Sequence, residues 1–308
     1  MILVSVLIAI ALDRLLFWHR DSPVGRWLAS WIDLVVTRLP VGWDGVGGIL
    51  AVILPPALLM LAVQWLIAGW LFGLVSLIVG VAVLLFMFGP LDIINTVDDY
   101  IEARRNEDAE RSDFAYERVV GAAPPRAHGT DEGRTMARAL FYQGHDHMFA
   151  TLFWFCILGP VGAVFYRFSA EAALRPTPAL VARPALARAA RDVVSVLGWI
   201  PTRLLAFGYA MTGSFEETVA RLRAGRAHGM DPLQDNQTLL ADAGTVAMRD
   251  DRRWDPDPDP DNDADDTGGE RRSGDEADIV TAARALMLRA GIFWLAILAL
   301  LTLTGWFA

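Results

Sequence analysis

The sequence predicts an all-α protein that crosses a membrane several times. Of its residues 54% are hydrophobic, above the roughly 45–50% usual for soluble proteins. The excess is concentrated in three blocks without Asp, Glu, Arg, Lys or His: residues 45–91, 148–166 and 290–308. Because a bilayer span needs about 20 apolar residues, each shorter block fits one helix and the long block fits a hairpin of two. The predicted fold class is therefore a polytopic helical membrane protein with four clear transmembrane helices.

The elements follow from these blocks in chain order. The first residues, 1–17, form an additional apolar helix that carries the adjacent charged pair Asp13-Arg14. A polar, Trp-rich connector at 18–44 precedes the long block, and a charged helical stretch at 92–138 follows it. The four spans are expected at residues 47–66, 67–89, 148–167 and 286–308.

One segment, residues 193–215, is an intermediate case because it is apolar but contains a charge, Arg203. A charged arginine at the centre of a span costs about 2.5–3.5 kcal/mol on insertion scales. The segment fits a span with a buried arginine, a re-entrant helix or an interfacial helix, and Pro201 would bend it. We expect a helix at the edge of the bundle or partly within the membrane.

Composition divides the chain into three parts. Residues 1–250 form a membrane-embedded helical domain whose polar helical loop covers 92–146. The acidic, Pro/Gly-rich residues 251–278 form a disordered linker, because they cannot bury enough apolar surface to fold, and 279–308 form the last transmembrane helix. Acidic residues in this linker match several ligand positions of an EF-hand calcium-binding loop. The sixth position of that loop requires glycine, however, and Ala264 occupies it here. No metal site is predicted there.

Charge and motif content exclude several classes of function. The net charge of −9 lacks the basic surface that nucleic-acid binding needs. A single cysteine excludes an intrachain disulfide or a cysteine metal cluster. All 27 basic residues are arginine, so the lysine-containing phosphate loop of nucleotide-binding proteins is absent. We predict no metal and no cofactor, and the partner that the composition requires is the lipid bilayer.

Three polar residues, His145, Asp146 and His147, stand directly before the third span. A polar helix start at the headgroup level is the favoured interpretation, since an acid in the first turn suits the helix dipole. A polar site shared with other segments is the alternative. A metal site is the least favoured, because residues two apart on a helix point about 200° away from each other.

Two further charged groups are candidates for a site. Neighbouring residues such as Asp13 and Arg14 cannot pair across one helix face, so each needs another partner or an interface position. Arg203 follows Trp199 by four residues, which allows the guanidinium to stack on the indole ring. A snorkelling arginine at the membrane surface is the favoured interpretation for Arg203, and the stacked arginine is the alternative.

Two stretches carry a family resemblance: "ATLFWFCILGPVGAVFYR" at 150–167 and "VLGWIPTRLLAFGYAMTG" at 196–213. They resemble the AmpE proteins, which are inner-membrane members of the CobD/CbiB superfamily, and "ALDRLLFWHRDSPVGRW" at 11–27 is similar to the acidic opening helix of that superfamily. The synthases of the superfamily carry Glu-Asn-x-x-Asp before the third span. Here Tyr142 and Gln143 occupy the first two of these positions, and Asp146 alone matches.

The resemblance implies a bacterial inner-membrane regulator linked to cell-wall recycling, β-lactamase induction and the response to antibiotics. It would bind an unidentified ligand, such as a muropeptide or a phosphorylated small molecule, in a polar cavity between helices. The residues expected to line this cavity are Asp13, Arg14, Asp146, Arg167, Trp199 and Arg203. The alternative is an amide-forming synthase of the CobD/CbiB type, similar to adenosylcobinamide-phosphate synthase, in which Asp146 orients an amine. A small transporter is the third reading.

Overall fold

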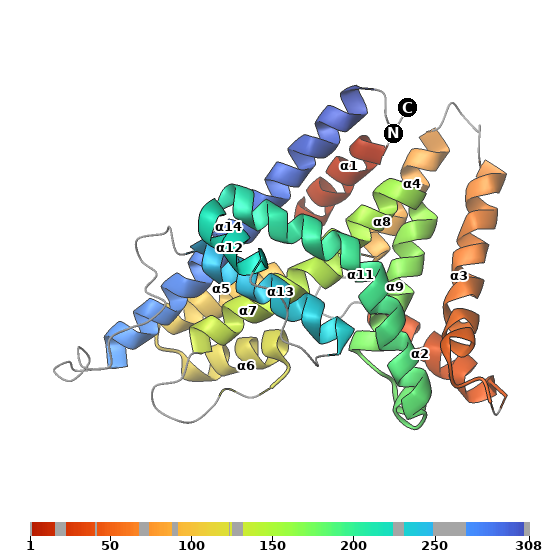
Figure 1. The fold of residues 1–308 in the computed structure, drawn as a ribbon, viewed down its shortest axis with the longest axis horizontal. Coiled ribbons are helices and arrows are strands. Elements are labelled where there is room, and N and C mark those ends of the chain that lie inside the picture. The colour runs from red at the N-terminus through yellow and green to blue at the C-terminus, as the bar shows by residue number, and fades with distance from the viewer. Residues whose placement is uncertain are drawn as a thin grey trace.

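A computed structural model describes residues 2–15, 23–40, 42–67, 74–87, 92–122, 124, 132–223, 231–248 and 269–304. This part of the chain consists of helices and short connections (Figure 1). The helices are α1 (Ile2–Leu15), α2 (Pro23–Arg38), α3 (Val46–Ile67), α4 (Leu74–Met87), α5 (Asp92–Arg105), α6 (Ala109–Val120), α7 (Glu132–Gly144), a π-helix (His145–Phe149), α8 (Ala150–Leu158), α9 (Pro160–Leu174), α10 (Pro178–Val181), α11 (Pro184–Thr212), α12 (Phe215–Arg223), α13 (Pro232–Ala247) and α14 (Gly269–Leu303).

Three of these helices are long and apolar enough to cross a bilayer: α3, α11 and the part of α14 from Glu276 to Leu303. Two shorter apolar helices accompany them, Leu3–Leu12 within α1 and α4. Large apolar side chains point outward from α3, where Leu59 is 68% and Trp65 81% exposed. Such a surface is stable only against lipid or a partner, so the chain is a multi-pass membrane protein.

The predicted first and last spans correspond to α3 and α14. The second predicted span, 67–89, contains the 14-residue α4, and the residues on either side of α4 lie outside the described ones. The intermediate segment at 193–215 belongs to the 29-residue α11, which meets the length and hydropathy of a span.

The third predicted span, 148–167, is wrong as a single helix. The chain breaks at Gly159, whose φ of +65° favours glycine. Pro160 then starts α9, because proline suits the first helical position. The two short helices α8 and α9 pack against each other at Gly162, where a Cβ would overlap the Trp154 carbonyl oxygen. An uncharged stretch of the right length thus forms a tight helical hairpin.

Only the last part of the predicted linker, 251–278, can be compared with the structure, because residues 249–268 lie outside the described ones. Residues 269–278 are helical and belong to α14. Ion pairs join this part of α14 to α5, since Arg104 pairs with Glu276 and Arg105 with Asp278.

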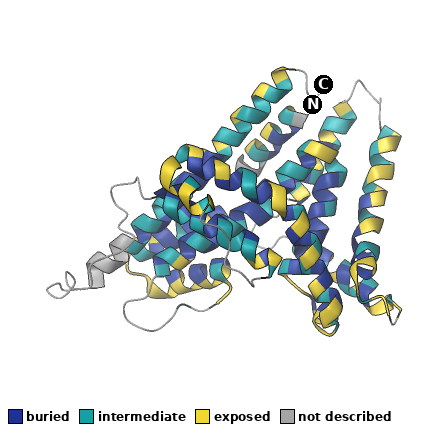
Figure 2. Cartoon of the chain, in the orientation of Figure 1, coloured by how far each residue is buried: buried dark blue, intermediate teal, exposed yellow. Residues whose placement is uncertain are grey.

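Buried residues of the described chain form two large hydrophobic cores and a small third cluster of Ala150, Tyr166 and Ala170. Figure 2 colours the buried residues dark blue where helices face one another. We call the first the soluble-side core, a name taken only from the charged helices α5, α6 and α7 that contribute to it. It is built by α5, α6, α7, α13, the second half of α11 and the first half of α14. The second, the bundle core, is built by α1 to α4, α8, α9 and the first half of α11. In Figure 1 the soluble-side core lies around α5, α6, α7 and α13, while the bundle core lies around α2, α3, α4 and α9.

Candidate functional site

The π-helix at His145–Phe149 joins α7 to α8 without ending the helical run, since the Ala150 N–H bonds to the His145 carbonyl. The expected polar helix start at residues 145–147 is therefore wrong. One extra residue in a turn shifts the side chains that follow it around the helix axis, and such π-turns are frequent at functional sites. The insertion lets α7 bury Phe141 in the soluble-side core and α8 bury Phe155 in the bundle core.

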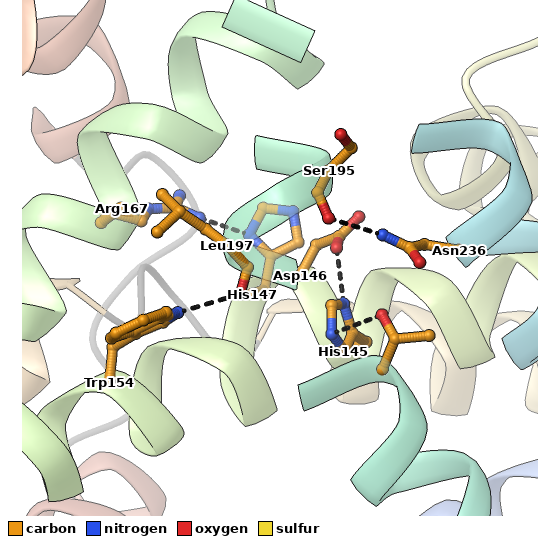
Figure 3. Close-up of polar contacts among 9 residues, drawn as sticks. His145, Asp146, His147, Trp154, Arg167, Ser195, Leu197 and Asn236 are labelled. Carbon is orange, nitrogen blue, oxygen red and sulfur yellow. Dashed lines mark hydrogen bonds and ion pairs between the residues drawn. The ribbon is translucent and has the colours of Figure 1, made fainter. Parts of the chain in front are cut away.

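The π-helix brings His145 and Asp146 into a buried hydrogen-bonded chain with Thr202 of α11 (Figure 3). His145 Nδ1 lies 2.7 Å from Asp146 Oδ1, and His145 Nε2 lies 3.2 Å from Thr202 Oγ1. An ionised carboxylate only accepts hydrogen bonds, so Nδ1 carries the proton and the Thr202 hydroxyl donates to Nε2. This order fixes the tautomer of His145 and leaves its Nε2 as a base.

The facing stretch of α11 is irregular as well. Pro201 has no N–H, so the carbonyl of Leu197, four residues earlier, loses its normal helical partner. The Trp154 indole Nε1–H donates to that carbonyl at 3.2 Å (Figure 3). Two residues earlier, Asn236 Nδ2 of α13 donates to the Ser195 carbonyl at 2.9 Å. Side chains from α8 and α13 thus hold the bent part of α11.

A second buried polar group lies on α9. Arg167 Nη1 donates to His147 Nδ1 at 2.7 Å, and Arg167 Nη2 lies 3.4 Å from Glu171 Oε2. The guanidinium always donates, so the proton of neutral His147 is on Nε2. The side chains of Arg167 and Glu171 are only 4% and 5% exposed. A buried ion pair of this kind is stable only as a pair.

The stacking of Arg203 on Trp199, which was the less favoured of the two interpretations, is present in the structure. The guanidinium carbon lies 4.0 Å from the centroid of the indole. Arg203 Nη1 also donates to the Trp199 carbonyl at 2.9 Å and to Asn236 Oδ1 at 3.4 Å. Asn236 therefore connects Arg203 to the bent part of α11.

A small, partly open pocket lies beside the polar chain, between the π-helix, α11 and α13. Its lining is His145, Asp146, Tyr166, Val194, Gly198, Thr202, Leu233, Asn236, Gln237 and Leu240. Within the described residues, the buried Tyr166 hydroxyl has no hydrogen-bond partner. A buried hydroxyl without a partner costs free energy, so this atom is suited to meet a group that enters the pocket.

Of the six residues expected to line a cavity, Asp146 lines this pocket. Arg203 reaches it through Asn236, and Trp199 lies against Arg203 with 49% of its surface exposed. Arg167 follows the pocket residue Tyr166 but is turned toward His147 and Glu171. The side chains of Asp13 and Arg14 lie outside the described part of the chain.

Three residues of the site were not predicted: Thr202, Asn236 and Tyr166. His145 was named only in the alternative of a polar site that residues 145–147 share with other segments. The signal for Thr202 was Pro201, which marks an irregular helix, whereas no local pattern marks Asn236. Among the side chains that the structure describes, no group of three His, Cys, Asp or Glu residues is placed to bind a metal ion.

Comparisons with known proteins give one family match and two distant relatives. Two curated relatives, both named "Cobalamin biosynthesis protein CobD" from Rhodobacter capsulatus, are 27% identical over 178 residues. The alignments cover 53% of this chain and 54% of each relative, so the chain matches about half the length of these relatives. No solved structure matches the chain. The family model for the regulatory signalling modulator protein AmpE matches residues 1–236, and the chain thus belongs to the AmpE family.

Proposed function

We propose that this protein is a regulatory signalling modulator of the bacterial inner membrane that links cell-wall recycling to β-lactamase induction. We propose further that it responds to a ligand at the pocket beside the π-helix. Family membership supports the regulatory role. The observation that carries the sensing role is the buried chain Asp146–His145–Thr202 beside the unpartnered Tyr166 hydroxyl. Ionisable groups in an apolar bundle are expensive, and they mark functional sites by default.

The ligand that we propose is a muropeptide or a phosphorylated small molecule. The pocket is small, so it would receive one polar group of such a ligand while the rest lies outside. Asp146 would accept a hydrogen bond from that group, and Tyr166 would donate or accept one. Arg203, stacked on Trp199 near the pocket, would hold an anionic part of the ligand, because a guanidinium binds phosphate or carboxylate through two hydrogen bonds.

Induction of β-lactamase in the host tests this function. The gene is deleted with the neighbouring genes left intact, and plasmids carrying wild type, Asp146→Asn or Asp192→Asn are compared. Asp192 is the matched control, since it is an exposed acid on α11. We expect wild type and Asp192→Asn to restore the normal induction profile, whereas Asp146→Asn fails despite equal membrane levels. An induction profile that the deletion leaves unchanged contradicts the regulatory role.

A second candidate function is an amide-forming synthase with a diverged substrate, favoured by the similarity to CobD proteins. In this function, Asp146 holds the proton of His145 on Nδ1, so that Nε2 is the basic nitrogen. An attacking amine would have to displace the Thr202 hydroxyl from Nε2 before giving its proton there. Arg203 would hold a phosphate group. Calorimetry with purified protein and with nucleotides or phosphate esters tests the idea. Binding that Asp146→Asn and Arg203→Ala abolish supports it, and equal binding by all three proteins opposes it.

A further inference from the structure

Among the described residues, four helical runs pass between the soluble-side core and the bundle core: α7–α8, α11, α13 and α14. Two of them, α7–α8 and α11, are irregular where they cross, whereas α13 buries Leu233 in the bundle core and Leu240 in the soluble-side core without a break. The run α7–α8 contains the π-helix, with Phe141 in one core and Phe155 in the other. Helix α11 buries Val194 in the bundle core and Leu205 in the soluble-side core, and Pro201 lies between them. The bend in α11 is visible in Figure 1. Irregular turns inside helices are common at hinges.

The fourth run, α14, crosses as a continuous helix. Its Ala290 is buried in the soluble-side core, whereas Leu295 packs partly against the bundle core. Gly291 lies at the crossing, and a Cβ there would meet nothing within 4 Å. The next turn of α14 is packed, since Trp294 lies against Phe149 with the ring centroids 5.9 Å apart. The junction of the two cores is therefore marked by the irregular turns of α7–α8 and α11, while α14 crosses it as a regular helix.

Two side-chain hydrogen bonds hold the bent part of α11 at this junction. Trp154 comes from α8 and bonds the Leu197 carbonyl, and Asn236 comes from α13 and bonds the Ser195 carbonyl. The Trp154 bond replaces the helical hydrogen bond that Pro201 cannot make to the Leu197 carbonyl, and the Asn236 bond is additional. The bend is thus determined by contacts from both sides of the junction, and not by the proline alone.

We infer that this junction is a ligand-controlled hinge, in which occupancy of the pocket sets the bend of α11 and so the relative position of the two cores. The pocket lies at the hinge, because Gly198 and Thr202 of α11 and His145 and Asp146 of the π-helix all line it. A polar group between Asp146 and Tyr166 would occupy the space beside α11 and restrict its movement toward the π-helix. The inference rests on the sensing site proposed above and adds how that site acts on the rest of the molecule.

Spin-label distances across the junction test the hinge. In a Cys156→Ser background, labels are placed on Ser30→Cys of α2 and Glu117→Cys of α6, which are exposed positions beside different cores. Double electron–electron resonance in lipid nanodiscs gives the distance distribution. A second pair, Glu117→Cys with Glu216→Cys on α12, lies on the soluble side and controls for general loosening.

Three variants act on the hinge in different ways. Trp154→Phe removes the donor to the Leu197 carbonyl, and we expect a broader distribution across the junction. Pro201→Ala restores a helical N–H, so we expect α11 to straighten and the cross-junction maximum to move. Gly198→Ala places a methyl group 3.6 Å from His145 Cε1 and 3.7 Å from Asn236 Nδ2, which are ordinary contacts. It fills pocket space without a clash, and we expect a narrower distribution.

The control pair should keep its distribution in all three variants. Cross-junction distributions of Trp154→Phe and Gly198→Ala that superimpose on wild type overturn the hinge, even if Pro201→Ala does not fold. The spin-label distances are measured without a ligand, so they test the hinge independently of the proposed sensing role. If the cross-junction distances change but Asp146→Asn restores normal induction of β-lactamase, the hinge is supported and the sensing role is rejected. If the distances do not change but Asp146→Asn fails to restore induction, the hinge is rejected and the sensing role is supported.

Discussion

Arg167 illustrates how single residues carry charge in this apolar bundle. Its guanidinium is buried between His147 and Glu171, and its Nε atom has no partner within the described residues. Transfer of an isolated charge into an apolar interior is far more costly than transfer of a polar group. The pair persists because each charge compensates the other, so neither can be removed alone without a penalty.

We therefore expect Arg167→Met to lower the free energy of unfolding by about 3–5 kcal/mol, the usual effect of leaving a buried charge without its partner. The double variant Arg167→Met with Glu171→Leu should lose much less, because both charges are then absent. Unfolding titrations in mixed micelles measure the difference. Equal losses in the single and double variants would show that the two charges are not energetically coupled.

At the scale of elements, close approach determines where the hairpin of α8 and α9 can form. Gly162 is the contact point, since a Cβ there would overlap the carbonyl of Trp154. Small residues allow such approach in membrane helices generally. The same carbonyl belongs to the residue whose indole holds the bend of α11, so the hairpin also positions one contact of the candidate site.

Gly162→Ala should separate α8 from α9 and destabilise the protein by roughly 1–3 kcal/mol, as other overpacking substitutions do. Gly47→Ala of α3 is the matched control, because a Cβ there meets nothing within 4 Å. The control should be neutral or slightly stabilising, as alanine favours helices over glycine. Thermal unfolding of both variants in detergent decides the matter. Similar melting temperatures for the two would mean that the hairpin can open at no cost.

At the scale of the whole molecule, α14 completes a core that begins far away in the chain. Its buried residues face α5 and α7 and include Ala277, Val280, Ala283, Leu286 and Met287. Arg284 also pairs with Asp98 of α5 at 2.7 Å. The family match ends at residue 236, yet the soluble-side core is open without this later helix.

A chain that ends at residue 248 should therefore expose apolar core surface and aggregate or be degraded. Arg105→Gln is a control for the loss of polar contacts alone, since its exposed pair with Asp278 should contribute at most about 1 kcal/mol. Gel filtration and membrane levels measure both. A monodisperse truncated protein at wild-type levels would show that α14 is not needed to close the core.

Properties that depend on local sequence were predictable. Charge-free blocks identified α3 and the end of α14 as spans, because the stability of a helix in lipid depends on the average hydrophobicity of about 20 consecutive residues. The stacking of Arg203 on Trp199 was one of two interpretations, and it came from their spacing of four residues, since side chains one helical turn apart are neighbours. Asp146 was recognised as a polar residue at the edge of an apolar block, which is also a local property.

Tertiary packing decided the rest. The break at Gly159 has a local signal in the Gly159-Pro160 pair, because such pairs mark turns. The π-helix at 145–149 has none, because it depends on which faces α7 and α8 must bury. Thr202 meets His145 across 57 positions of sequence, and Asn236 reaches Ser195 across 41. By itself the sequence indicated whether a segment is surrounded by lipid or by water, and which side chains are neighbours within one helical turn. Only the packing of helices against one another decided which polar groups meet, because that depends on long-range burial and not on local periodicity.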